Sequence, residues 1–196
     1  THRGAILRTQ LPLPLSQALK ALAQREGATP FMVLLAAFQV LMSRYSGQDD
    51  ISVGSPIAGR NRGEVEGLIG FFVNTLVLRS RLSPQRSFRE LLAQVKETTL
   101  GAYAHQEVPF EKLVEELQPE RDLSRSPLFQ VMFVVQNAPM PDLVLPELKL
   151  RPMAAEGRTA KFDLTLTFTE QADGFHTELE YNTDLYEAAT ARRMLE

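Results

Sequence analysis

Two neighbouring segments, 162–169 and 175–181, alternate strictly between apolar and polar residues, and a short link, 171–174, joins them. A period of two places every second side chain of a strand on the same face of a sheet. The apolar positions are Phe162, Leu164, Leu166 and Phe168 in the first segment and Phe175, Leu179 and Tyr181 in the second. The pattern predicts a β-hairpin with one face on a core and the other toward water.

Other segments predict further strands. Residues 128–135 form a continuous apolar run, which is typical of a central strand buried on both faces. Residues 50–57 and 71–82 have strand character, and 148–153 resembles an edge strand. The segments expected to be irregular are the glycine-rich loop 58–67, the proline-rich excursion 138–146 and the polar, mobile stretch 154–160.

Helical patterns lie between these strands. The expected helices cover 16–26, 30–45, the residues after Ser87 as far as 104, 109–117 and 187–196. Pro30 suits a first helical position, because the N–H it lacks would have no partner there. Ser87 and Glu90 have capping-box spacing. The sum predicts an α/β fold: a two-layer sandwich in which a mixed sheet of about five strands carries packed helices.

Composition excludes several function classes. The net charge is −3, so there is no basic excess of the kind that nucleic-acid binding requires. The chain has no cysteine, which excludes disulfides and zinc–thiolate sites. No apolar run reaches about 18 residues, so no membrane partner is expected. With no signal peptide visible either, we expect a cytoplasmic protein whose last helix is cut at Glu196.

Motifs with their own chemistry are not found. His2, His105 and His176 share no ligand spacing, so no metal site is expected. The sequence contains no nucleophile elbow, Walker loop or dinucleotide fingerprint. The residues alone therefore indicate a fold class without a reaction.

Three segments carry a family resemblance. They are Ile-Gly-Phe-Phe-Val-Asn-Thr at 69–75, with Arg79 beyond it, His-Gln-Glu-Val-Pro-Phe-Glu at 105–111, and Arg-Asp-Leu-Ser-Arg-Ser-Pro-Leu at 121–128. In order and spacing they resemble the fifth, sixth and seventh core motifs of the condensation domains of nonribosomal peptide synthetases. The resemblance extends over nearly the whole chain.

The resemblance implies that this chain is one half of a larger catalytic domain. The family's domain is a V of two chloramphenicol acetyltransferase-like lobes with a tunnel between them. An acyl or peptidyl thioester and an amino acid amine enter on carrier-protein phosphopantetheine arms, and a peptide bond forms. Residues 1–196 resemble the C-terminal lobe. The family's catalytic motif, His-His-x-x-x-Asp-Gly, belongs to the N-terminal lobe and does not occur here.

That absence implies no catalytic residue in this chain and no activity of the chain alone. The implied partners are the N-terminal lobe, upstream and downstream carrier proteins, and an adjacent adenylation domain. No cofactor is expected to be bound intrinsically, because phosphopantetheine arrives on the carriers.

The resemblance also suggests roles for individual residues. Asn74, Gly70 and Thr75 are candidates for the tunnel side. Asn74 would orient a thioester or pantetheine amide, or only tie its strand to a neighbouring loop. Arg60 and Arg62 are candidates for the lobe junction, where Arg60 would pair with a carboxylate, or simply belong to a solvated turn.

The remaining motif residues are expected to be structural. His105 and Gln106 would cap or bridge the helix that starts at Pro109, and Phe110 would anchor it in the core. The stretch that precedes the buried strand would form a hydrogen-bonded loop through Arg121, Asp122, Ser124 and Arg125. The excursion 138–146 resembles the region where the family's latch leaves this lobe.

Several functions stay open. The chain could come from a condensation domain that joins L-residues, from a dual condensation/epimerisation domain, or from a catalytically silent relative that docks other enzymes. A further possibility is a structural fragment without activity. The intactness of the histidine motif in the other lobe separates catalysis from docking.

Overall fold

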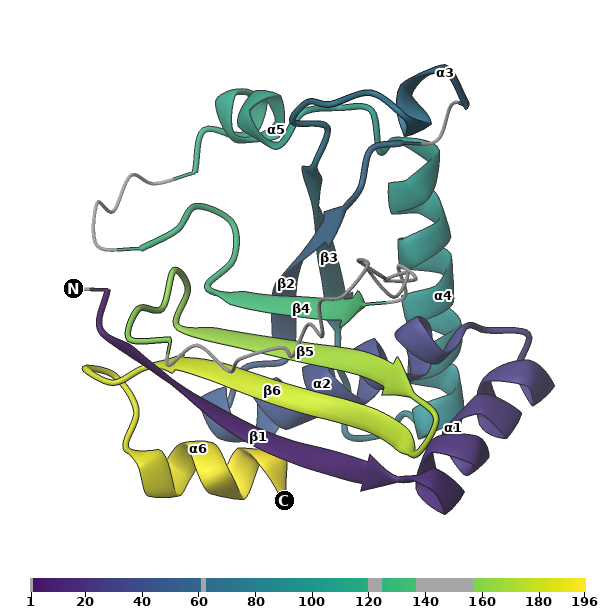
Figure 1. Cartoon of the computed structure of the whole chain (residues 1–196). Coiled ribbons are helices and arrows are strands. Elements are labelled where there is room, and N and C mark those ends of the chain that lie inside the picture. The colour runs from purple at the N-terminus through teal and green to yellow at the C-terminus, as the bar shows by residue number, and fades with distance from the viewer. Residues whose placement is uncertain (1, 61–62, 120–124, 137–156) are drawn as a thin grey trace, which may run out of the picture.

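The computed structural model describes residues 2–60, 63–119, 125–136 and 157–196. Within these residues a six-stranded mixed sheet has the order β1-β6-β5-β4-β2-β3 (Figure 1). The strands are β1 (Gly4–Pro12), β2 (Asp50–Ile57), β3 (Asn74–Arg81), β4 (Val131–Gln136), β5 (Leu164–Gln171) and β6 (Gly174–Asn182). The helices are α1 (Leu13–Arg25), α2 (Pro30–Ser46), α3 (Gly63–Glu66), α4 (Phe88–Ala104), α5 (Phe110–Leu117) and α6 (Ala188–Leu195).

The predicted hairpin is confirmed as β5 and β6, which pair antiparallel with Leu166 opposite Leu179. The apolar run is also confirmed as a central strand, because β4 lies between β5 and β2 and is parallel to both. Strands β2 and β3 form a second antiparallel pair at one side of the sheet. The remaining edge strand, β1, pairs antiparallel with β6.

Helices α1, α2 and α4 pack on the sheet and on one another (Figure 1). The core between the layers contains side chains with almost no exposed surface, among them Phe133, Leu35, Leu78 and Leu92. The helix ends follow local chemistry as expected. Thr29 caps α2 ahead of Pro30, Gly47 ends it at φ 68°, and the Ser87–Glu90 capping box begins α4.

The structure corrects several expected boundaries. The strand expected over 128–135 begins only at Val131, because Leu128 has a left-handed φ of 66° that interrupts extended backbone. The strand expected over 71–82 begins at Asn74, and the loop 58–67 contains the short helix α3. Strand β1 was not expected at all. The edge strand and excursion expected over 138–153 lie outside the described residues.

The helices of this chain do not have the form of a membrane span. Among the described residues, no single helix is both long and apolar enough to cross a bilayer. Helices α1 and α2 meet the length and hydropathy criteria only when taken together, and they are bent by 105° at the break between them.

Candidate functional site

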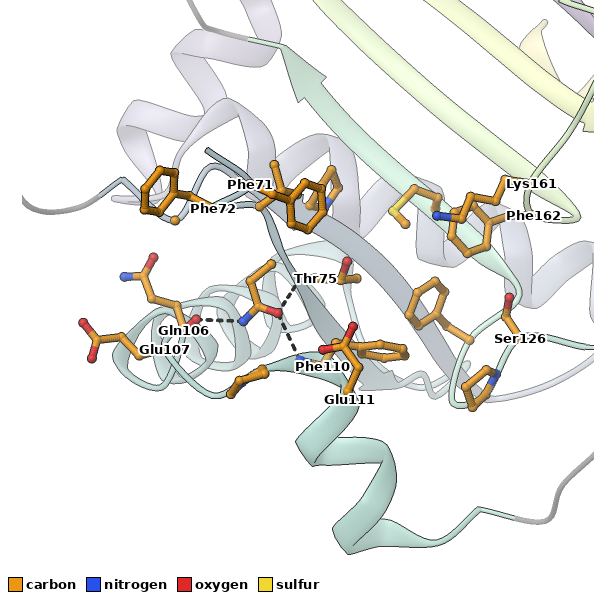
Figure 2. A pocket seen from close by; sticks show the side chains of 18 of the residues that line it. Phe71, Phe72, Thr75, Gln106, Glu107, Phe110, Glu111, Ser126, Lys161 and Phe162 are labelled. Atoms are coloured by element: carbon orange, nitrogen blue, oxygen red, sulfur yellow. Dashed lines mark hydrogen bonds between the residues drawn. The ribbon is translucent and has the colours of Figure 1, made fainter. Parts of the chain in front are cut away.

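A pocket of about 1040 Å³, here called the aromatic pocket, lies where β2, β3 and β4 meet the loops before β3, α5 and β5. Figure 2 shows its labelled residues arriving from these separate segments, with Phe71 and Phe72 from the first loop and Lys161 and Phe162 from the last. The pocket therefore depends on the tertiary fold and not on one motif.

Three aromatic rings form a row in the pocket. The centroids of Phe110 and Phe129 lie 5.5 Å apart, and those of Phe129 and Phe162 lie 5.4 Å apart. Phe129 is buried, whereas the two flanking rings keep part of their surface exposed. A Cβ at Gly54 of β2 would lie 2.3 Å from the ring of Phe129, so this strand glycine makes room for the middle ring.

Asn74 fixes one wall of the pocket. Its side-chain nitrogen donates to the carbonyl oxygens of Gln106 and Val108 at 2.9 and 2.7 Å. Its side-chain oxygen accepts from the backbone N–H groups of Thr75 and Phe110 at 2.8 and 3.1 Å (dashed in Figure 2). These four bonds, here called the Asn74 clamp, use both amide hydrogens and both oxygen lone pairs.

The clamp bears on the two roles expected for Asn74. An amide with all four hydrogen-bonding positions filled by backbone has none left for a thioester or a pantetheine, so the geometry favours the tie between strand and loop. It also corrects the expected capping of α5. The N-cap residue of α5, Pro109, makes no side-chain hydrogen bond to the helix. The Phe110 N–H donates to Asn74 and not to the side chain of His105 or Gln106.

His105 and Gln106 act through their backbone. His105 ends α4 with an exposed side chain, and its carbonyl oxygen accepts the Val108 N–H at 3.1 Å. The Gln106 carbonyl belongs to the Asn74 clamp. Phe110, expected in the core, is half-buried in the aromatic pocket instead. The difference arises because α5 packs at the end of the sheet near β3 and not between the main layers.

Polar groups at the pocket are few. Thr75 lines it beside the Asn74 clamp, and its hydroxyl makes no hydrogen bond to any residue that the structure describes. Glu107 and Glu111 bring negative charge, and the Lys161 ammonium lies 5.7 Å from the centroid of the Phe162 ring. Of the predicted tunnel-side residues, Thr75 thus keeps hydrogen-bonding capacity for a ligand.

Arg60 holds the loop that closes one side of the pocket. Its guanidinium lies 4.5 Å from the centroid of the Phe72 ring and donates to the carbonyl oxygens of Val65 and Gly70. Gly59 has a φ of 63°, and a Cβ there would lie 1.9 Å from the Phe72 carbonyl oxygen. Arg60 therefore belongs to a folded loop and not to a solvated turn. Its pairing with a carboxylate of the other lobe stays a prediction, and Arg62 lies outside the described residues.

The same loop exposes apolar side chains. Ile69 and Phe71 are 105% and 91% exposed, and Val73 and Val108 about half exposed. Phe71 and Val73 line the pocket, and Asn74, the residue after Val73, donates to the Val108 carbonyl. We call Ile69, Phe71, Val73 and Val108 the apolar rim. Gly70, within it, has a negative φ, and a Cβ there would lie 2.9 Å from the Phe72 ring.

Among its described residues, the third motif reaches the aromatic pocket only through Ser126 and Pro127, which line it. Arg121, Asp122 and Ser124 fall outside the described residues. Arg125 lines a different hollow, together with Asp163, whose pKa is raised by burial and lowered less by the charge of Arg125. Arg79 lines that hollow too and binds Asp50 through two bonds of 2.7 and 2.6 Å, which hold the pKa of that carboxyl below its usual value.

Sequence reasoning missed most of the pocket. Gly54, Phe129 and Lys161 line or shape it but belong to none of the tunnel candidates. The one local sequence signal of the pocket was Gly54, because a glycine within a strand often marks a close approach by another part of the chain. No three His, Asp or Glu side chains cluster to hold a metal ion in the described ranges.

Comparisons with known proteins identify relatives of this chain. The family model of the condensation domain matches residues 3–196. A linear gramicidin synthase protein from Brevibacillus parabrevis is 57% identical over 196 residues, which are 99% of this chain and 2% of that protein. The chain therefore spans a small part of the relatives that it matches.

Solved structures show the same fold. A holo four-domain nonribosomal peptide synthetase bound to AMP and glycine matches with a TM-score of 0.91 at 27% identity, over 99% of this chain and 16% of that one. The complex of the X-domain and OxyB from teicoplanin biosynthesis contains a chain that matches with a TM-score of 0.83 at 28% identity, over 98% and 44%. These likenesses confirm the predicted mixed α/β fold.

Proposed function

The chain belongs to the condensation-domain family, and on that premise we propose that it is the second lobe of a domain that makes peptide bonds. The complete domain would join a carrier-bound acyl or peptidyl thioester to the amine of a carrier-bound amino acid. This chain would supply one wall of the reaction tunnel and would be inactive alone.

The observation that carries this proposal is the apolar rim beside an open pocket. A contiguous group of large exposed apolar side chains marks a surface that another protein surface covers. Ile69 and Phe71 have almost their whole side chains exposed, and Phe71 lines a cavity that already contains aromatic rings. The first lobe, closing over this rim, would complete the cavity.

A tunnel enclosed by two lobes suits the chemistry of thioester aminolysis. The amine attacks the thioester carbonyl, a C–N bond forms, the C–S bond breaks, and the amine proton must leave as the thiol is released. Such a reaction gains most from holding two tethered ends in line and excluding water. In this chain the aromatic row would exclude water, and the free hydroxyl of Thr75 would position a polar group of the tethered substrate.

The proton and the developing oxyanion would be handled by the first lobe and its histidine motif. Phosphopantetheine would arrive covalently on the upstream and downstream carriers, with an adenylation domain loading the amino acid. Within the family, the form of residues 105–111 favours a domain that joins L-residues or a dual condensation/epimerisation domain.

A second candidate function is docking without catalysis. It is favoured by the likeness to the X-domain that was solved in complex with OxyB. In this alternative the same lobe would bind another enzyme, and the histidine motif of the first lobe would be degenerate.

The decisive experiment uses the two-lobe domain with carriers loaded with a donor thioester and an acceptor amino acid. Dipeptidyl thioester formation, detected by mass spectrometry, is expected from the two-lobe domain and not from residues 1–196 alone. An intact histidine motif without product from varied carriers would refute the catalytic function and favour docking.

The role of the apolar rim is tested separately. The first lobe, produced as its own polypeptide, is expected to bind this chain and to lose about tenfold or more in affinity with Phe71→Asp. Leu185→Asp is the matched control, because Leu185 is a similarly exposed apolar residue of the β6–α6 connection. Equal losses in both variants would contradict the rim as the lobe contact.

A further inference from the structure

A third hollow, of about 400 Å³, lies where α2 ends and α4 begins, and it shares no lining residue with the aromatic pocket. Its charged lining consists of Arg44 from α2, Arg81 from β3, Arg86 from the turn before α4, and Asp49. Helix α2 and the segment from β3 to the start of α4 thus bring guanidinium groups to one surface. We call this surface the arginine hollow.

The positive charge of the arginine hollow is only partly compensated. Arg81 shares the carboxylate of Asp50 with Arg79, and its 3.4 Å contact is the longer one, since Arg79 binds both oxygens at 2.7 and 2.6 Å. One carboxylate therefore faces two guanidinium groups. Asp49 is exposed and forms no ion pair with any described residue.

The other two arginines, Arg86 and Arg44, form no ion pair with a carboxylate of any described residue. Arg86 donates to the neutral amide oxygen of Gln94 at 2.9 Å. The nearby carboxylate of Glu90 is held by Ser87, whose backbone N–H and hydroxyl donate to it at 2.7 and 2.8 Å. Arg44 is exposed and has no hydrogen-bond or ion-pair partner in the part of the chain that the structure describes.

The floor of the arginine hollow is apolar. Val40, Leu82 and Leu91 line it, and Phe88 at its edge keeps 37% of its surface exposed. A free inorganic anion would gain nothing from such a floor, and exposed arginines bind it weakly. A polypeptide that carries carboxylates around an apolar side chain would use both features, because guanidinium groups pair bidentately with carboxylates.

Charge also argues against a nucleic acid. The whole chain has a net charge of −3, and three guanidinium groups give too small a footprint for a phosphate backbone. We propose that the arginine hollow docks an acidic polypeptide segment with an apolar residue at its centre. This inference does not depend on the condensation chemistry, since the hollow is separate from the aromatic pocket.

The test uses fluorescence anisotropy of a fluorescein-labelled octapeptide, Glu-Asp-Leu-Glu-Asp-Leu-Glu-Asp, with the whole chain at about 0.02 M salt, where screening is weak. The double variant Arg44→Glu with Arg86→Glu is expected to weaken binding by about tenfold or more. The matched control, Arg192→Glu with Arg193→Glu on α6, changes the net charge equally and is expected to keep the affinity within about twofold. Circular dichroism verifies that both variants fold.

Four results would overturn the proposal. They are the absence of peptide binding at low salt, equal weakening by the control pair, full displacement by millimolar inorganic phosphate, and unchanged affinity when serine replaces both leucines of the peptide. The last two would show a simple anion site without the apolar component. Amide NMR shifts concentrated at Gly47, Ser83 and Phe88 on peptide addition would support it.

Discussion

Two groups of phenylalanines in this molecule have opposite surroundings. In the core, Phe133 has no exposed surface, and its ring centroid lies 5.4 to 5.8 Å from those of Phe31, Phe38 and Phe168. In the aromatic pocket, spacings of 5.4 and 5.5 Å recur, but Phe110 and Phe162 stay partly exposed. Similar ring packing thus forms a sealed core where helices cover it and lines an open pocket where they do not.

The largest expected effect comes from truncating one ring in each group. Phe133→Ala should lower the free energy of unfolding by about 3–5 kcal/mol, since it leaves a cavity in a sealed core. Phe162→Ala should cost about 1–2 kcal/mol, because a partly exposed ring loses less buried area. Urea denaturation measures both.

If Phe133→Ala does not fold, Phe133→Leu serves as the control. It keeps most of the side-chain volume and should lower the free energy of unfolding by about 1.5 kcal/mol or less. Equal losses from alanine at the two positions would remove the distinction between core and pocket.

The next effect concerns the space that Gly54 leaves for Phe129. Gly54→Ala should cost about 1–3 kcal/mol, because its Cβ would lie 2.3 Å from the ring. Phe129→Leu in the same chain should recover part of that loss, as a double-mutant cycle would detect. The matched control is Gly101→Ala in α4, where a Cβ meets nothing within 4 Å and stability should rise by about 0.5–1 kcal/mol.

The Asn74 clamp predicts a more local effect. Asn74→Ala should cost about 1–2 kcal/mol and speed hydrogen exchange of the Phe110 amide, which loses its acceptor. Asn74→Asp keeps acceptors for that amide but places a carboxylate against the Gln106 and Val108 carbonyls. It should therefore destabilise the chain while protecting Phe110 better than alanine does. An unchanged exchange rate at Phe110 in Asn74→Ala would contradict the clamp.

The smallest expected effect is electrostatic. Burial raises the pKa of Asp163, so the folded state holds this proton more tightly than the unfolded state. The side chain then destabilises the fold increasingly as pH rises from its ordinary value through the raised folded value. Asp163→Asn should have nearly the same free energy of unfolding as wild type at low pH. At pH 7 its free energy of unfolding should be higher than that of wild type by less than about 1 kcal/mol. Denaturation at several pH values measures this.

Asp50 serves as a control, because its pKa is lowered whereas that of Asp163 is raised. Hydrogen bonds from Arg79 lower the pKa of Asp50, so its contribution is present above its ordinary value and lost as pH falls through the lowered one. Asp50→Asn should therefore be less stable than wild type at pH 7 and equal to it in acid. Parallel pH trends for the two variants would refute one of the assignments.

The sequence predicted those elements whose signals are local. Strand β2 has the predicted bounds, α4 ends at the predicted residue, and the hairpin of β5 and β6 follows the alternation of its side chains. Strand β1 was missed because its alternation is weak and its partner, β6, lies more than a hundred residues away in the chain. Leu128 was placed in a strand because its left-handed backbone leaves no trace in its residue type.

The candidate site was less predictable. Asn74 was found from the motif around it, but its partners lie 32, 34 and 36 residues further along the chain. The row of Phe110, Phe129 and Phe162 joins three elements whose separate patterns contain no sign of the others. Tertiary packing, which periodicity does not encode, decides both features.

The pairing of β1 with β6 has a consequence for the order of events during synthesis. Gly4 lies opposite Asn182, and Pro12 opposite Gly174. While a ribosome is still making the middle of the chain, the first strand has not yet received the neighbour that this sheet assigns to it. Sheets whose pairings span long sequence separations fold slowly, because a large loop must close first. This sheet should therefore be completed only after β6 has been synthesised.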